Sequence, residues 1–286
     1  MKQTWIVALV VSLVSLVPLA AAMPRAEALK QIESSMLVKG SIETNADGSV
    51  NSLVINQPDK FPGGLVDFVQ KQVKDWKFEP VMVDGKAMRA RSPMSLRVVA
   101  RKVDEDGYSI TIRNANFDGE PPKEGESLSS KQLKPPRYPE SVARSGASGT
   151  AYVAVKVGAS GRVVDAVVEQ VNLLTLGTAR EMEGWRSALA DAAVKAARSW
   201  TFIPPVVGEL ADDEFWTARV PVDFKMDDRR RFVYGKWEQY IPGPRQPIPW
   251  SEEDRPGFSP DSLASGGVYM MGQSTGPKLL TALDGT

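Results

Sequence analysis

The same series of sequence patterns occurs twice along the chain, and this repetition constrains the fold more than any other feature. In the second occurrence, apolar residues alternate with others over residues 151–157, and Val163, Ala166, Val167 and Val168 follow as the returning strand. A period of two predicts strands with one buried face. Gly161, between the runs, can adopt the positive φ of a tight turn. The segment therefore predicts an antiparallel hairpin.

A helix and a third strand are expected after this hairpin. Apolar residues recur at spacings of three and four over residues 182–200, which places them on one face of a helix. Pro204 and Pro205 follow, and proline cannot continue a helix. Alternation resumes over residues 215–224. The second occurrence thus predicts a three-stranded antiparallel sheet with one face covered by a helix.

The first occurrence repeats these patterns in the same order. Its expected elements are strands at residues 38–44, 50–55 and 94–99 and a helix at residues 61–75. The segment Trp76–Pro80 stands where the second occurrence has Trp200–Pro204. Ordered matches with changing offsets indicate a duplication with insertions. We predict an α+β fold with two tandem modules, each a three-stranded antiparallel sheet covered by a helix, followed by a Pro-rich tail.

The N-terminus has the pattern of an export signal. Lys2 precedes the apolar stretch of residues 6–19, and three alanines end at Ala22. This order predicts a secretory signal peptide over residues 1–22 that is cleaved after Ala22. A retained membrane anchor is the alternative, because the apolar segment barely reaches the roughly 17–25 residues that span a bilayer. Under both interpretations the remaining chain lies outside the cytoplasm.

Proline and glycine clusters set the expected boundaries. We predict a first module at residues 30–116, a linker at 117–134, a second module at 135–228 and a tail at 229–286. Residues 108–112 alternate like an additional strand. Proline-rich tails favour extended structure, so the tail is either a strap that lays its aromatic residues on the protein or a ligand for an aromatic groove. Beyond Ser259 we expect disorder. The aromatic residues in question are Trp237, Tyr240 and Trp250.

Composition excludes several function classes. The 35 basic and 35 acidic residues cancel, so no net charge attracts nucleic acid. The chain has no cysteine and no histidine, which excludes disulfides, zinc fingers and thiol nucleophiles and removes the commonest general base. No phosphate-binding loop or nucleophile elbow is present. The sequence predicts a non-enzymatic protein with no catalytic residue, no metal site and no cofactor.

The order of residues in the second module resembles the C-terminal domain of TonB. That pattern runs from a Tyr-Pro start through turn glycines to a Trp-x-Phe-x-Pro segment and an alternating strand. The resemblance is strong over about residues 130–226 and weak over about residues 35–101, where the Tyr-Pro start is missing and the copy is degenerate. The matching residues are Tyr138, Pro139, Gly149, Gly161, Trp200, Phe202 and Pro204.

The resemblance implies a mode of binding. TonB proteins are energy transducers of the Gram-negative envelope that hand motive force to outer-membrane receptors, and a receptor peptide adds as a strand to their sheet. An exposed sheet edge offers unpaired N–H and C=O groups for such a strand. The last strand of the second module is the expected edge. Its predicted partner-binding residues are Thr217, Arg219, Val220, Pro221, Val222, Asp223, Phe224 and Lys225.

The spacing between the apolar segment and the first module differs from that of a transducer. At roughly 3.3–3.6 Å per extended residue, these few residues reach a few tens of Å at most. The leading expectation is therefore a periplasmic TonB-like protein that binds an outer-membrane receptor or another envelope protein by strand addition. One alternative is a short transducer, anchored in the inner membrane, for receptor-dependent transport. The other is a structural module that dimerises through its sheet edges.

Overall fold

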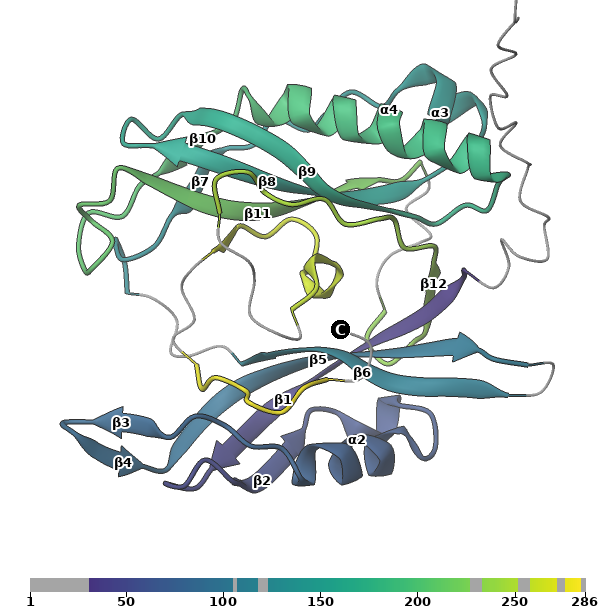
Figure 1. Ribbon diagram of the computed structural model, residues 1–286. Coiled ribbons are helices and arrows are strands. Elements are labelled where there is room, and N and C mark those ends of the chain that lie inside the picture. The colour runs from purple at the N-terminus through teal and green to yellow at the C-terminus, as the bar shows by residue number, and fades with distance from the viewer. Residues whose placement is uncertain are drawn as a thin grey trace, which may run out of the picture.

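The computed structural model describes residues 31–104, 107–117, 123–226, 233–251, 258–271 and 276–283. The fold is α+β and its sheets are antiparallel. Two sheets lie face to face, each has a helix on its outer side, and parts of the tail lie between them (Figure 1). The predicted signal peptide or anchor, residues 1–22, lies outside the described residues.

The N-terminal sheet is built on the predicted first hairpin. Strand β1 (Glu33–Thr44) pairs with β2 (Val50–Ile55) and along its other side with β5 (Ala90–Lys102). Helix α2 (Leu65–Lys74) covers the outer face and buries Leu65, Val69 and Val73. Two further strands extend the sheet: β6 (Tyr108–Phe117) pairs with β5, and β12 (Glu238–Tyr240) pairs with β1. Among the described residues this sheet therefore has five strands, and the prediction of three is wrong.

The C-terminal sheet contains the predicted second hairpin and third strand. Its central strand β8 (Gly149–Gly158) pairs with β9 (Val163–Leu173) and with β11 (Phe215–Phe224). Strand β13 (Tyr269–Met270), from the tail, pairs with the other side of β11. The order is β13-β11-β8-β9, so this sheet has four strands among the described residues instead of three. β6 begins with the additional strand expected at residues 108–112, whereas β12 and β13 come from the tail and pair with strand edges that local periodicity leaves open.

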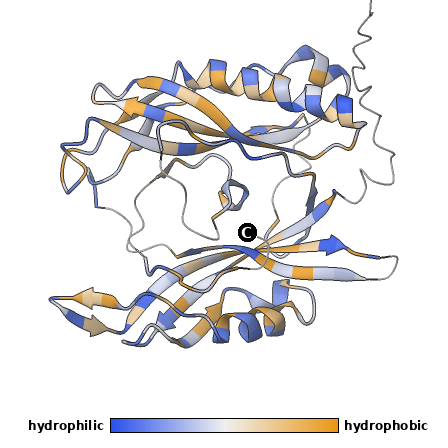
Figure 2. Cartoon of the chain, in the orientation of Figure 1, coloured by the Kyte–Doolittle hydropathy of each residue, from blue (hydrophilic) through white to orange (hydrophobic). Residues whose placement is uncertain are grey.

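Helix α4 (Ala179–Ala197) lies along the outer face of the C-terminal sheet, as predicted from its apolar spacing. Thr178 begins it with a capping box, in which its side chain accepts from the backbone of Glu181 and the Glu181 side chain accepts from Thr178. Hydrophobic and hydrophilic residues alternate around the helix (Figure 2). Its buried residues are Met182, Leu189, Ala193 and Ala197.

Equivalent glycines make the same contact in both halves of the chain. Gly48 and Gly161 have φ values of 78° and 73°. The N–H of Phe78 donates to the Gly48 carbonyl, and the N–H of Phe202 donates to the Gly161 carbonyl, both at 2.8 Å. A Cβ on Gly48 would lie 2.0 Å from the carbonyl oxygen of Phe78, and one on Gly161 would lie 2.2 Å from that of Phe202. Backbone conformation and close approach therefore both require glycine at each turn.

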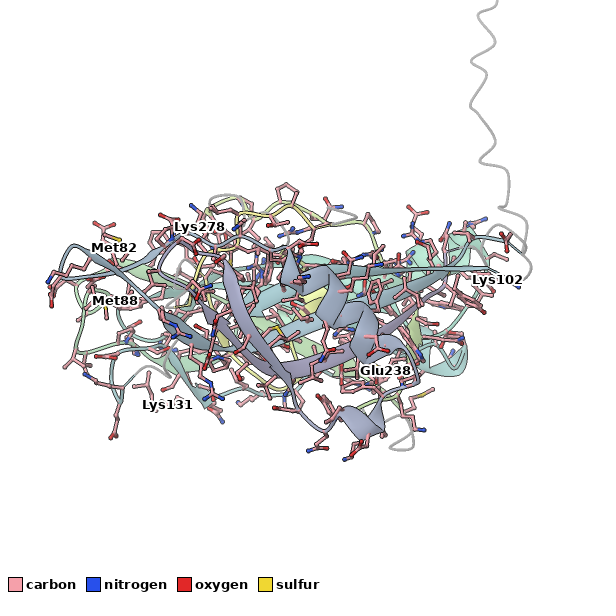
Figure 3. The ribbon with its side chains drawn as sticks, turned by 90° about the horizontal axis from the view of Figure 1, so that it is seen from below. Met82, Met88, Lys102, Lys131, Glu238 and Lys278 are labelled. Atoms are coloured by element: carbon pink, nitrogen blue, oxygen red, sulfur yellow. The ribbon has the colours of Figure 1, made fainter. Side chains whose placement is uncertain are left out.

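Short elements complete the fold. Strand β10 (Thr201–Ile203) pairs with β7 (Ser129–Gln132), which precedes the C-terminal hairpin. Strands β3 (Val81–Val83) and β4 (Lys86–Met88) form a separate hairpin, whose Met82 and Met88 lie at one end of the molecule, opposite Lys102 (Figure 3). The remaining elements are the 3-10 helices η1 (Pro58–Lys60) and η2 (Pro260–Ser262) and the short helix α3 (Glu140–Arg144).

The described parts of the tail are ordered against the two sheets. Tyr240 is buried, and Trp237 packs against the core of the N-terminal sheet. The strap interpretation of the tail is confirmed for these residues. The expectation of disorder beyond Ser259 is wrong for residues 260–271 and 276–283, because Leu263 and Leu283 are buried there and β13 pairs with β11.

Candidate functional site: the outer edge of β11

The predicted partner-binding residues lie on β11 and just after it. β11 pairs with β8 from Phe215–Gly158 to Phe224–Gly149. Asp223 is exposed and Lys225 is half-buried. The other predicted residues are buried: Thr217, Arg219, Val220, Pro221, Val222 and Phe224.

The outer edge of β11 carries a short strand of the tail. Ala218 is opposite Met270 and Arg219 is opposite Tyr269, and these two pairs constitute the β11–β13 ladder. The N–H of Met271 donates to the Thr217 carbonyl at 2.8 Å. Backbone groups in an antiparallel strand alternate between its two neighbours, so residues 217, 219, 221 and 223 face outward. Proline at position 221 agrees with this, because an outward position needs no N–H for the ladder to β8.

The equivalent edge of the N-terminal sheet is covered differently. Strand β5 follows α2 in the chain as β11 follows α4, and each pairs with the first strand of its hairpin. The outer side of β5 is paired with β6 from Met94–Phe117 to Lys102–Tyr108. The outer side of β11 has only the two-residue β13. The outer edge of β5 therefore has a strand partner over Met94–Lys102, and the outer edge of β11 has one at two positions near its middle.

Arg219 points toward the tail and not toward an incoming strand. Its Nε lies 2.5 Å from Oε2 of Glu169, and both side chains are almost fully buried. Nε of Arg245, in the tail, donates to Oε1 of the same carboxylate at 2.7 Å. The ring of Phe258 lies 4.4 Å from Cζ of Arg219. The buried carboxylate on β9 thereby links β11 to the tail through two guanidinium groups.

Asp223 also links β11 to the tail. Its Oδ1 accepts from the Thr150 hydroxyl at 2.6 Å and from the Ser265 hydroxyl at 2.7 Å. Its Oδ2 lies 3.0 Å from Nζ of Lys225. Burial opposes the ionisation of Asp223, but the hydrogen bonds from Thr150 and Ser265 and the nearby ammonium together outweigh it and hold the pKa of Asp223 below its usual value.

A cavity of about 970 Å³ lies between the two sheets. Arg97 of β5 and Tyr152 of β8 contribute to its walls, and Tyr240 and Asp261 of the tail contribute to the same walls. The hydroxyl of Tyr240 lies 2.8 Å from Oδ2 of Asp261 and 3.1 Å from Oε2 of Glu33. Burial and these two carboxylates raise the pKa of Tyr240. The inner faces of the sheets are thus joined by polar contacts through the tail.

Glu33 is the corresponding buried carboxylate of the N-terminal sheet. It is 1% exposed and forms a bidentate pair with Arg113 of β6, at 2.6 Å and 2.7 Å. Arg101 of β5 also pairs with it. Sequence reasoning did not single out either Glu33 or Glu169, because a glutamate within a strand pattern is typical of a solvated face and only tertiary packing buries it.

The residues of the TonB-like pattern have structural contacts. The hydroxyl of Tyr138 donates to the Ala147 carbonyl at 2.5 Å, and its ring packs edge-on against Phe224 with centroids 5.6 Å apart. Nε1 of Trp200 donates to the Lys134 carbonyl at 2.8 Å. These contacts tie the segment before the hairpin to β11 and to the end of α4.

The remaining pattern residues act through backbone geometry and packing. A Cβ on Gly149 would lie 2.4 Å from the Asn172 carbonyl oxygen, so this strand position needs glycine. Phe202 is 2% exposed in the core. Pro139 is the N-cap of α3, and Cδ of Pro204 lies 3.4 Å from the position that a Gly161 Cβ would occupy.

The tail residues that complete this edge were missed at the level of sequence. Residues 268–271 are four apolar residues between Gly267 and Gly272, a short β-prone run that could have indicated a strand. Because the neighbouring tail is rich in proline, irregular structure was expected for this run instead. Arg245 lies in the proline-rich part of the tail, and no local pattern marks it as an anchor, whereas Tyr240 was expected as one of the aromatic residues of the strap.

Comparison with known proteins gives one relevant relative. The chain is 36% identical over 92 residues to Protein tonB2 of Pseudomonas aeruginosa, a match that covers 32% of this chain and 29% of the relative. The chain thus spans less than a third of the relative's length. No protein-family model matches the chain, and no solved structure matches it. The match supports a relation to TonB-type envelope proteins.

Within the described ranges, no helix has both the length and the apolar character required to cross a bilayer. Nor do the described residues bring three or more aspartate and glutamate side chains together as a metal site would require.

Proposed function

We propose that this chain is a non-enzymatic TonB-like protein of the Gram-negative envelope that binds extended segments of partner proteins by strand addition at the outer edge of β11. The similarity to Protein tonB2 and the TonB-like order of residues 138–204 support this proposal. Main-chain hydrogen bonds would supply affinity, and the side chains beside the edge would supply selectivity.

One observation carries the proposal. β6 pairs with the outer edge of β5 over Met94–Lys102, whereas the equivalent edge of β11 is bridged by two residue pairs. This two-residue ladder supports the addition of an antiparallel strand at β11, because most of the edge has no strand partner among the described residues. Beyond the ladder to β13, the outward position 223 has an N–H for such a strand, and Pro221 supplies only a carbonyl.

The domain organisation is part of the same proposal. We propose a degenerate TonB-like module at residues 30–116, a linker at 117–134, a second module at 135–228 and a tail at 229–286. The shared element order and the matching contacts of Gly48 and Gly161 support a duplication. In this arrangement the first module is a scaffold, because its own edge strand is already paired with β6.

Location follows from the N-terminal pattern. Residues 1–22 would export the chain to the periplasm and be removed, leaving a free binding protein. Retention of that segment would instead give an inner-membrane-anchored energy transducer for transport through outer-membrane receptors. The similarity to Protein tonB2 favours this second candidate.

A dimerisation module is the third candidate. The outer side of β6 has no strand partner among the described residues, and Tyr108 and Ile110 near its start are 61% and 40% exposed. Open edges with few charges pair with copies of themselves. Sedimentation of the purified chain over a range of concentrations distinguishes this candidate from a monomeric binding protein.

Replacement of Asp223 by proline tests strand addition. The N–H of Asp223 faces outward, so Asp223→Pro removes a donor from the outer edge without removing one from the ladder to β8. We expect at least about a tenfold loss of affinity for peptides from the periplasm-facing segments of outer-membrane receptors. The reason is that the loss of one main-chain hydrogen bond at the edge also weakens the adjacent hydrogen bonds to the peptide. Isothermal titration calorimetry measures the affinity.

Asp223→Ala is the matched control, because it removes the same carboxylate and keeps the N–H. Both variants lose the contacts to Thr150 and Ser265, so any difference between them belongs to the backbone. Equal peptide affinities for the two variants would show that the edge of β11 is not the binding surface.

A further inference from the structure

Residues 268–271, called here the tail strand, occupy the edge at which a partner would add. They include β13 and the N–H of Met271 that donates to Thr217. We infer that the tail strand is an internal substitute for the partner segment, and this inference rests on the proposed function. The site takes an extended, uncharged segment that runs antiparallel to β11 with a methionine opposite Ala218, and the partner binds by displacing the tail strand.

The backbone pairing defines the direction and register of that segment. Met270 is opposite Ala218, Tyr269 is opposite Arg219, and the strands are antiparallel. The hydrogen bond from Met271 to Thr217 makes positions 271 and 217 a hydrogen-bonded pair. Positions 270 and 218 are then a non-hydrogen-bonded pair, in which side chains lie closest. The side chain opposite Ala218 therefore makes the closest side-chain contact with β11 and contributes most to selectivity.

The surroundings of Met270 define the chemistry of that residue. Ala218 is fully buried and small, which leaves space beside it for a long side chain. Sδ of Met270 lies 3.0 Å from the Leu128 backbone N and 3.3 Å from the Ser127 hydroxyl, and both groups donate to the sulfur. Leu128 is itself buried. The space bounded by Ala218, Ser127 and Leu128 is called here the socket. A side chain in the socket must be apolar along its length and carry an acceptor at its end, and methionine has both properties.

The tail strand is also easier to displace than a regular strand. It contributes two residue pairs, whereas β6 covers β5 from Met94 to Lys102. Gly266 and Gly267 precede it, and Gly266 has a φ of 82°. Glycine linkers lose more conformational entropy when they are ordered than other residues do. A longer partner strand would gain further pairs along residues 220–223, which are outside the ladder that the tail strand makes.

An engineered disulfide tests displacement within a single protein. The chain has no cysteine, so Ala218→Cys combined with Met270→Cys introduces one unique pair. The Cα atoms of a non-hydrogen-bonded antiparallel pair are about 4.5 Å apart, which a disulfide can bridge. The probe is a fluorescent peptide with the sequence of residues 264–271, and fluorescence polarisation measures its binding. We expect no binding by the oxidised chain and binding after reduction of the same sample.

A second pair of variants tests release without a disulfide. Met271→Pro removes the N–H that donates to Thr217, and Met271→Ala keeps it. The apparent dissociation constant equals the intrinsic value divided by the fraction of chains with a free edge, so Met271→Pro should bind the peptide about tenfold more tightly than Met271→Ala. Equal binding by these two variants, or by the oxidised and reduced disulfide forms, overturns the role of the tail strand.

Altered peptides test the socket. Norleucine in place of the methionine at position 270 keeps the length and loses the sulfur acceptor, and we expect binding to Met271→Pro to weaken about threefold. Aspartate at that position should abolish binding because an unpaired charge would be buried. Equal binding of all three peptides overturns the preference for methionine. Failure of every form, Met271→Pro included, to bind the unaltered peptide overturns strand addition at β11 and with it the proposed function.

Discussion

At the scale of single residues, backbone conformation explains the positions that the two halves share. Gly48 and Gly161 lie in equivalent turns. Their carbonyls accept equivalent hydrogen bonds from the backbone N–H groups of Phe78 and Phe202, which belong to the two Trp-x-Phe segments. The glycine requirement has two parts, positive φ and the close approach of a carbonyl oxygen. Gly146 has a positive φ of 67° but no close approach, because a Cβ there would meet no atom within 4 Å.

Alanine substitutions separate these two parts. Gly146→Ala should lower the free energy of unfolding by about 1–2 kcal/mol, the usual difference between glycine and other residues in the left-handed region. Gly161→Ala adds a clash with the Phe202 carbonyl at 2.2 Å and should cost at least about 1 kcal/mol more, because backbone must shift to relieve it. Urea denaturation of both variants measures the difference. Equal losses would mean that the turn relaxes freely away from Phe202.

At the scale of elements, helices and hairpins form where local patterns and caps agree. The apolar spacing of α4, its alanine content and the Thr178–Glu181 capping box all favour the same helix. Helix α2 has no side-chain cap and begins after Gly64, which has a φ of 80°. This is why the observed helix begins at Leu65 and not at residue 61: Pro62, Gly63 and Gly64 form the turn before it.

The cap of α4 gives a prediction at this scale. Thr178→Ala removes the hydroxyl that accepts from Glu181 and should destabilise the protein by about 1 kcal/mol. Thr178→Ser keeps the hydroxyl and should retain most of the stability. Thermal unfolding followed by far-UV circular dichroism compares the three proteins. An alanine variant with the melting temperature of the serine variant would exclude a stabilising role for the cap.

At the scale of the whole molecule, the tail joins the two sheets through buried charges. Glu169 is 1% exposed and is shared by Arg219 of β11 and Arg245 of the tail. On the N-terminal sheet, Glu33 pairs with arginines of β5 and β6 and meets Tyr240 of the tail. Removal of one partner from such a buried ion pair leaves an uncompensated buried charge, which destabilises the fold.

Replacement of Glu169 should therefore lower the free energy of unfolding more than replacement of Arg245. Glu169→Ala leaves the buried Arg219 guanidinium without its partner and should cost about 3–5 kcal/mol. Arg245→Ala leaves the Glu169–Arg219 pair in place and removes a side chain that is 41% exposed, so it should cost less. Urea denaturation measures both values. A larger loss for Arg245→Ala than for Glu169→Ala would contradict this account of the network.

Local sequence determined the two hairpins, the two covering helices, the strands after them and the turn glycines. These elements depend on periodicity, caps and glycine positions within a few residues of each other. Tertiary structure alone decided the placement of β12 and β13, the burial of Glu33 and Glu169, and the partial covering of the β11 edge. A two- or three-residue strand has little intrinsic preference of its own, and it forms where a strand edge elsewhere in the fold offers unpaired backbone groups.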